Sequence, residues 1–140
     1  MAAAIQEALV VSETVGVPAK VVYDFSRQME NLPLWASGLA AGIRQRDGAW
    51  FADSPMGQVE VEMAPVNPFG VLDHDVTLPD GVRVHNAFRV TPCGEGSLLS
   101  FVVLRPPDAS AQSFEADVAH VRRDLAALKQ LVERQHRPPA

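Results

Sequence analysis

The stretch SAQSFEADVAHVRRDLAALKQLV, residues 110–132, decides the fold of this chain. Its apolar residues recur alternately three and four positions apart, a spacing that places side chains on one face of a helix. These residues are Ala111, Phe114, Val118, Val121, Leu125, Leu128 and Val132. Ser110 can cap such a helix, and the two prolines at 106 and 107 end the element before it. We predict a long amphipathic C-terminal helix whose apolar face is covered by a sheet.

The segments before this helix are short, Val-rich and separated by turn sequences, which is typical of an antiparallel meander. We predict strands at 8–15, 39–45, 49–54, 57–63, 70–78, 82–91 and 97–105. Two short helices are expected between the first two strands. Pro18 suits the first position of one helix, and the other spans 29–36, is interrupted by Pro33 and holds Trp35. The predicted fold class is α+β, with a curved antiparallel sheet of about seven strands around the C-terminal helix and two short helices plugging one end.

The turn at 78–81, Leu-Pro-Asp-Gly, fixes the register of one hairpin. A type I turn followed by a Gly bulge gives a three-residue loop, which pairs His74 with Asn86. A two-residue loop would mix polar and apolar side chains on each face, and a one-residue slip moves the whole apolar set of a strand to water. The three-residue loop places Leu72, His74, Val76, Asn86 and Phe88 on the inner wall, and the turns at 47–48 and 54–57 add Val61 and Phe51.

The same three-residue rule, applied to the turns at 47–48 and 54–57, places Phe51 on the inner face. Trp50 would then lie on the outer face beside Arg44 and Glu62, where a cation–π contact is expected. Asp53 would point inward near a strand end. The two turns agree on the inward position of Phe51.

Composition narrows the class of protein. The chain has 140 residues, a formal charge of −5 and 47% hydrophobic residues, which fits one globular domain. We assign residues 1–136 to that domain and 137–140 to a frayed tail.

The acidic balance and the lack of a Lys/Arg cluster lead us to expect no nucleic-acid partner. With no signal peptide and no long apolar run, we expect a cytoplasmic protein without membrane insertion. The sequence shows no metal-spaced Cys/His set and no cofactor motif, so we expect neither a metal nor a cofactor.

Candidate site residues lie on the predicted inner face. The triplet at 73–75, Asp-His-Asp, is not a site, because a strand points His74 away from both carboxylates. His74 and Asn86 form the polar pair of an otherwise apolar wall. They are either a buried histidine satisfied by an asparagine, or the polar anchors of an apolar pocket. The other candidate ligand-binding residues are Phe88, Phe51, Met63, Trp35 and Arg105. Arg105 either lies at the rim of this pocket or is a solvated strand-end arginine.

The chain resembles the SRPBCC superfamily, which includes START lipid-binding domains, the birch pollen allergen family and aromatase/cyclase-like proteins. Three segments carry the resemblance: VPAKVVYDF at 17–25 with NLP at 31–33 and Trp35, VLDHDV at 71–76 with LPDG at 78–81, and the helix at 118–131. They look like bacterial members labelled polyketide cyclase/dehydrase. The resemblance implies a helix-grip fold with an apolar cavity between sheet and long helix. No catalytic motif carries over residue by residue.

We therefore expect a protein that binds a small hydrophobic or aromatic molecule without catalysing a reaction. The alternative is an enzyme of the cyclase, aromatase or dehydratase kind, in which His74 acts as acid or base and Asn86 orients it. A third reading is an interaction module that uses the outer face, with Trp50 and the charged rows, to meet a protein partner. The sequence leaves a homodimer open.

Overall fold

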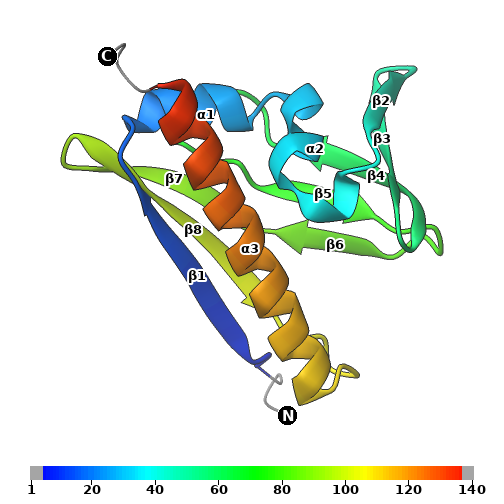
Figure 1. Ribbon diagram of the computed structural model, residues 1–140. Coiled ribbons are helices and arrows are strands. Elements are labelled where there is room, and N and C mark those ends of the chain that lie inside the picture. Colours follow the sequence, from blue (N-terminus) through cyan, green and yellow to red (C-terminus); the bar gives the residue numbers. More distant parts are fainter. Residues whose placement is uncertain (1–4, 137–140) are drawn as a thin grey trace.

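The computed structural model describes residues 5–136, so the tail assigned to 137–140 lies outside the described residues. Figure 1 shows a curved set of antiparallel strands with one long helix lying across its concave side. The elements, in chain order, are β1 (Ala8–Val15), α1 (Ala19–Ser26), η1 (Met29–Asn31), α2 (Leu32–Trp35), η2 (Ser37–Leu39), β2 (Ile43–Arg46), β3 (Ala49–Ser54), β4 (Gly57–Met63), β5 (His74–Thr77), β6 (Arg83–Asn86), β7 (Phe88–Cys93), β8 (Gly96–Leu104) and α3 (Ala111–Gln135). The α+β class and the long C-terminal helix are confirmed, with eight strands in the described residues where about seven were predicted.

The strands form two sheets, ordered β1-β8-β7 and β2-β3-β4-β5-β6. The segment 70–72 joins them, because it runs beside β7. The N–H of Leu72 donates to the carbonyl of Phe88 (2.8 Å), and the N–H of Val90 donates to the carbonyl of Gly70 (3.0 Å). The predicted strand 70–78 is therefore regular only from His74, and its first residues bridge the sheets.

The predicted strand 82–91 is divided at Ala87 into β6 and β7. Two hydrogen bonds explain the break. The N–H of Phe88 donates to the side-chain carboxylate of Asp73 (2.9 Å) instead of a strand carbonyl. The carbonyl of Ala87 accepts from Val102 of β8 (3.0 Å). The strand therefore leaves β5 and joins β8 at this point, which bends the sheet.

The prediction of a strand at 39–45 is wrong for its first residues. Successive turns occupy this segment, since the N–H of Leu39 donates to the carbonyl of Ala36 (2.9 Å) and that of Gly42 to Leu39 (3.0 Å). Gly42 has φ +123°, outside the range of a strand. The segment is therefore η2 followed by a turn, and β2 begins only at Ile43.

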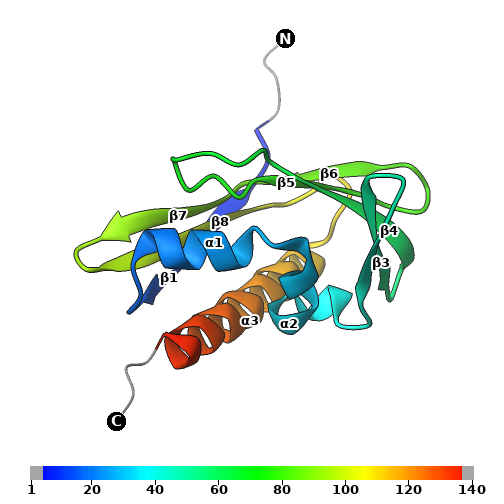
Figure 2. The ribbon, with the colours of Figure 1, turned by 90° about the horizontal axis from the view of Figure 1, so that it is seen from above.

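The helix α3 begins as predicted, because the hydroxyl of Ser110 accepts the N–H of Ser113 (3.0 Å). Its predicted stripe is inward except at its first residue: Phe114, Val118, Leu125, Leu128 and Val132 are buried and Val121 is half-buried, whereas Ala111 is exposed. The helix packs on β1, β8 and α2. Figure 2 shows α1 between β7 and α3, with the β3–β4 hairpin turned away at the far edge. The helix therefore covers one half of the concave side, and the inner face of β5 and β6 lies beyond it.

Candidate functional site

The hairpin of β5 and β6 positions the polar pair as the sequence predicts. The N–H of Leu78 donates to the carbonyl of Val82 (2.8 Å), which closes the three-residue loop. His74 consequently pairs with Asn86, and Val76 pairs with Val84. His74 and Asn86 therefore face the concave side from neighbouring strands, and both side chains are half-buried.

One hydrogen bond orients the ring of His74. Its Nδ1 lies 2.9 Å from the backbone carbonyl oxygen of Leu72. A carbonyl oxygen only accepts, so Nδ1 carries the proton and Nε2 faces Asn86. Burial lowers the pKa of His74; it outweighs the hydrogen bond to Leu72 and the charges of Asp73 and Asp75, which raise it, while the charge of His85 lowers it further. At neutral pH the ring is uncharged and Nε2 is an acceptor.

Aromatic rings surround this histidine. His74 meets Phe88 edge-on, with ring centroids 6.4 Å apart, and Phe101 at 6.0 Å. Trp35 of α2 packs against Phe88 in a tilted arrangement, with ring centroids 5.7 Å apart. Met63 of β4 is the strand partner of His74 on the other side. Phe88 and Trp35 are buried, whereas Phe101 and Met63 are half-buried. The predicted candidates Phe88, Met63 and Trp35 thus lie around one histidine, together with Phe101, which was not singled out.

The outer face of the same strands carries the charges, as the alternation of a strand requires. Asp75 bonds Arg83 (2.7 Å) and His85 (2.6 Å), and Asp73 bonds Arg89 (3.0 Å). Burial raises the pKa of Asp73, but hydrogen bonds from Arg89 and from the N–H of Phe88, with the charges of Arg89 and His85, lower it overall. The hydrogen bonds from Arg83 and His85 lower the pKa of Asp75. The triplet at 73–75 is not a single cluster, as predicted.

The predicted inward position of Phe51 is wrong. Asp47 (φ 53°) and Gly48 (φ 81°) form a two-residue loop, so Ile43 pairs with Ala52 and Arg44 with Phe51. Two residues also form the next loop, where Ser54 pairs with Gly57. Phe51 therefore lies on the outer face, under the guanidinium of Arg46 at 5.0 Å.

This change of register also reverses the faces that were predicted for the other residues of β3. Trp50, predicted on the outer face beside Arg44 and Glu62, lies inward and packs against the core. Asp53, predicted inward, is exposed and bonds Arg44 at 3.2 Å. Aspartate-glycine is a strong signal for a two-residue hairpin loop, and counting from that loop gives the observed register.

Arg105 lies at the end of β8 and does not reach His74. Its Nε donates to the carbonyl of Ala109 (3.0 Å), and its Nη1 donates to the carboxylate of Glu7 (2.9 Å). The side chain ties the start of β1 to the loop before α3. This is the structural role of a strand-end arginine and not that of a pocket rim.

A polar cluster formed by Ser37, His120 and Asp124 links η2 to α3. The carboxylate of Asp124 accepts from the hydroxyl of Ser37 (2.8 Å) and from its N–H (3.2 Å), and His120 lies 3.2 Å away. His120 uses the same nitrogen, Nε2, toward Asp124 and toward Ser37 (3.5 Å). The histidine therefore does not relay a charge from carboxylate to hydroxyl, and the cluster is a structural latch. Its partners are more than eighty residues apart, so no local pattern reveals it.

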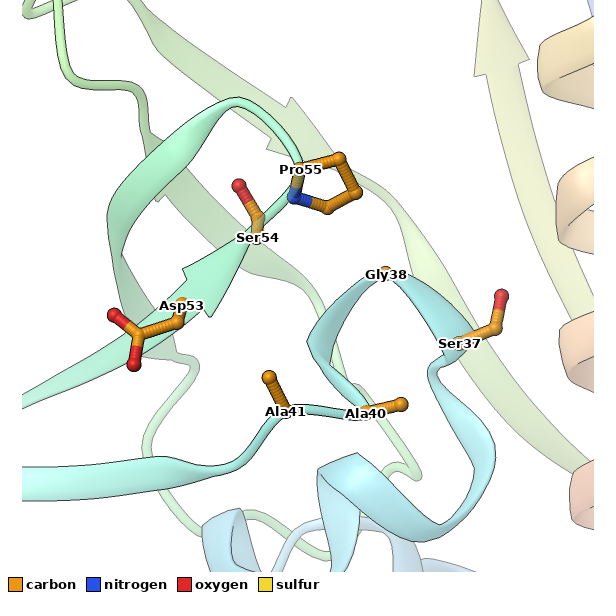
Figure 3. A pocket seen from close by; sticks show the side chains of 7 residues that line it. All are labelled: Ser37, Gly38, Ala40, Ala41, Asp53, Ser54 and Pro55. Atoms are coloured by element: carbon orange, nitrogen blue, oxygen red, sulfur yellow. The ribbon is translucent and has the colours of Figure 1, made fainter.

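A depression of about 350 Å³ lies between η2 and the β3–β4 turn, as Figure 3 shows. It is lined by Ser37, Gly38, Ala40, Ala41, Asp53, Ser54 and Pro55. Its polar groups already have partners: Ser37 bonds Asp124, Asp53 bonds Arg44, and the hydroxyl of Ser54 donates to the carbonyl of Gly57 (2.7 Å). Its other lining residues are small and mostly apolar, which makes the depression a poorer candidate than the face around His74.

In the described residues, no cluster of three or more His, Cys, Asp or Glu side chains could ligate a metal ion. No helix among them has the length and hydropathy needed to cross a bilayer.

No protein-family model matches the chain, and no curated protein matches it either. Solved structures are similar in fold. The protein XoxI from Bacillus cereus aligns with a TM-score of 0.71 at 13% identity, over 92% of this chain and 98% of XoxI. A START superfamily protein from Mycobacterium smegmatis aligns at 0.65 and 17% identity, over 91% and 98%. The Bet v 1-like protein Ara h 8.0201 aligns at 0.62 and 12% identity, over 91% and 97%.

These alignments cover about nine-tenths of the chain at identities below one in five. Similarity of this kind establishes the arrangement of the elements and leaves the chemistry of the site to its own residues. The chain has the helix-grip fold of the START and SRPBCC proteins.

Proposed function

We propose that this chain binds a small apolar or aromatic molecule on the inner face of β4, β5 and β6, with His74 and Asn86 as its polar anchors. The observation that carries the proposal is the position of this pair. It lies on an apolar, partly exposed concave face and is flanked by Phe88 and Phe101. A mainly apolar surface with a few placed polar groups is the usual composition of a small-molecule site.

The exposure of the inner face supports this assignment. Under α3 and α1, the inner residues of β1, β7 and β8 such as Val11, Val90 and Leu99 are at most 2% exposed. Beyond the helix, Val76 is half-buried and Val84 is 40% exposed although both point to the concave side. Burying this apolar area would lower the free energy of a complex by about 25 cal/mol per Å².

The geometry favours binding over acid–base catalysis. The Nδ1 of His74 bonds a backbone carbonyl, whereas a catalytic histidine is commonly oriented by a carboxylate on that nitrogen. The pKa of His74 is lowered by burial, which makes Nε2 a weaker base. The enzyme alternative therefore lacks the partner that would strengthen the base.

The test is a titration with N-phenyl-1-naphthylamine, a neutral probe that fluoresces in apolar surroundings. Val84→Glu places a charge on the inner face, and Val10→Glu places the same charge on the outer face of β1, where Val10 is 58% exposed. We expect saturable fluorescence with the unmodified protein and with Val10→Glu, and at least tenfold weaker binding with Val84→Glu. Equal binding by the two variants, or no binding by the unmodified protein, would refute the proposal.

A further inference from the structure

The hydrogen-bonding capacity of the polar pair is largely unused inside the protein. The amide nitrogen of Asn86 lies 3.4 Å from Nε2 of His74, longer than the usual 2.7–3.2 Å for a nitrogen donor. Within residues 5–136, this is the one hydrogen bond that reaches Nε2, and none reaches the side-chain oxygen of Asn86. A half-buried acceptor without a good donor lowers the stability of the folded protein unless water or a ligand supplies that donor.

The polarity of this spot follows from the orientation of the ring. Because Nδ1 holds its proton toward Leu72, the nitrogen facing the concave side presents a lone pair and not an N–H. The oxygen of Asn86 is a second acceptor beside it. Within this pair, a ligand group that only accepts, such as an ether, finds donors only in the amide N–H groups of Asn86, and a carboxylate meets the lone pair of Nε2.

The carboxylates near His74 do not change this polarity. Asp73 and Asp75 lie on the outer face, where they are paired with Arg89, Arg83 and His85. The rings that contact His74, Phe88 and Phe101, carry no charge. No cationic group of the described residues is bonded to Nε2 or to Asn86 that could attract an acid.

From this geometry we infer that His74 selects ligands that carry an uncharged O–H or N–H donor, such as an aromatic alcohol, and disfavours carboxylic acids and purely accepting ligands. The donor group bonds Nε2 while its ring packs against Phe88 and Phe101. This inference rests on the proposed function, since it concerns the same face, but it assigns the chemistry of the ligand.

Three naphthalenes of one shape test the selection: 2-naphthol, 2-methoxynaphthalene and 2-naphthoate, each titrated at pH 7.5 and followed by ligand fluorescence. We expect 2-naphthol to bind the unmodified protein about fivefold to tenfold more tightly than 2-methoxynaphthalene, the effect of one net hydrogen bond, and 2-naphthoate to bind most weakly. His74→Phe keeps an aromatic ring without the acceptor and should abolish the preference, leaving 2-methoxynaphthalene bound as before. His74→Gln, which restores an acceptor, should recover part of it.

A measurement without substitution checks the same bond. The ¹⁵N shifts of the His74 ring should show a protonated Nδ1 and a bare Nε2, and 2-naphthol should move the Nε2 signal. Equal affinities of the three ligands, tightest binding of 2-naphthoate, or a preference that survives in His74→Phe would overturn the inference while the proposed function stands. If none of the three binds, both fail.

Discussion

The alternation of side chains around His74 separates a neutral polar group on the inner face from charged groups on the outer face. The neighbouring residues Asp73 and Asp75 use their carboxylates on the outer face, with arginine partners. The histidine is left with a backbone carbonyl and aromatic rings. The sequence predicted this division because a strand has a period of two. It could not predict the bond from Nδ1 to Leu72, which depends on the rotamer of the ring.

The lowered pKa of His74 makes a prediction about pH. In the unfolded chain the His74 ring takes up a proton near pH 6.5, whereas the folded protein resists this protonation. The contribution of His74 to the unfolding free energy is therefore fully present well above pH 6.5 and falls as the pH drops toward the pKa of the folded state. We expect the unmodified protein to lose unfolding free energy relative to His74→Gln between pH 7 and pH 5. Urea denaturation of both proteins at each pH measures the difference in unfolding free energy. Because the two proteins share all other titratable groups, the contributions of those groups cancel in this difference. A difference that stays constant over this range would contradict the lowered pKa.

Gly70 makes a second prediction at this scale, because a Cβ there would lie 2.1 Å from the carbonyl oxygen of Val90. Gly81 also has a positive φ, but a Cβ there meets nothing within 4 Å. We expect Gly81→Ala to cost about 1–2 kcal/mol for the backbone alone. Gly70→Ala should cost about 1–3 kcal/mol more, because β7 must move. Equal losses of unfolding free energy in urea would show that 70–72 does not pack on β7.

Among the secondary-structure elements, the length of each hairpin loop decided whether the strand register was predicted correctly. The hairpin of β5 and β6 was predicted correctly because Leu-Pro-Asp-Gly has one favoured loop and the facing side chains agreed with it. The registers of β2, β3 and β4 were wrong because the same loop was applied to Asp47-Gly48 and to 54–57, where two-residue loops form. Trp50 and Phe51 are adjacent and both aromatic, so hydrophobicity alone could not choose between them.

The observed register of β3 predicts unequal effects for these two aromatic residues. Trp50 packs against the core, whereas Phe51 contacts Arg46 on the outer face. We expect Trp50→Ala to lower the unfolding free energy by about 2–3 kcal/mol and Phe51→Ala by about 1 kcal/mol. Chemical denaturation of the two variants compares them directly. A larger loss for Phe51→Ala would favour the register with a three-residue loop.

The latch between η2 and α3 predicts a stability loss that exposed helix residues do not share. Asp124 accepts two hydrogen bonds from Ser37, and its side chain is only 13% exposed. We expect Asp124→Ala to cost about 1–3 kcal/mol, because the N–H and hydroxyl of Ser37 lose their acceptor. The matched control is Asp117→Ala on the exposed side of α3, with an expected change within about 0.5 kcal/mol. Thermal denaturation of the pair separates the outcomes, and equal melting temperatures would disprove the latch.

At the scale of the whole molecule, the sequence predicted the class and order of elements, since each depends on local periodicity. The bend of the sheet was not predictable in this way. It depends on Asp73 taking the N–H of Phe88 and on Ala87 switching to β8, which are contacts between distant segments. This bend leaves the face around His74 beyond α3. The pairing of His74 with Asn86 was therefore predictable from the sequence, whereas the outward position of Phe51 and the partial exposure of the face were not predicted.

Two-dimensional NMR of the full chain titrated with 2-naphthol would show whether a ligand binds on the inner face of β4 to β6. We predict shift changes that concentrate on His74, Asn86, Met63 and Phe101, with little change in the outer-face residues Arg83 and His85. Changes confined to the depression around Ser37 and Ser54, or to the outer face, would contradict the account.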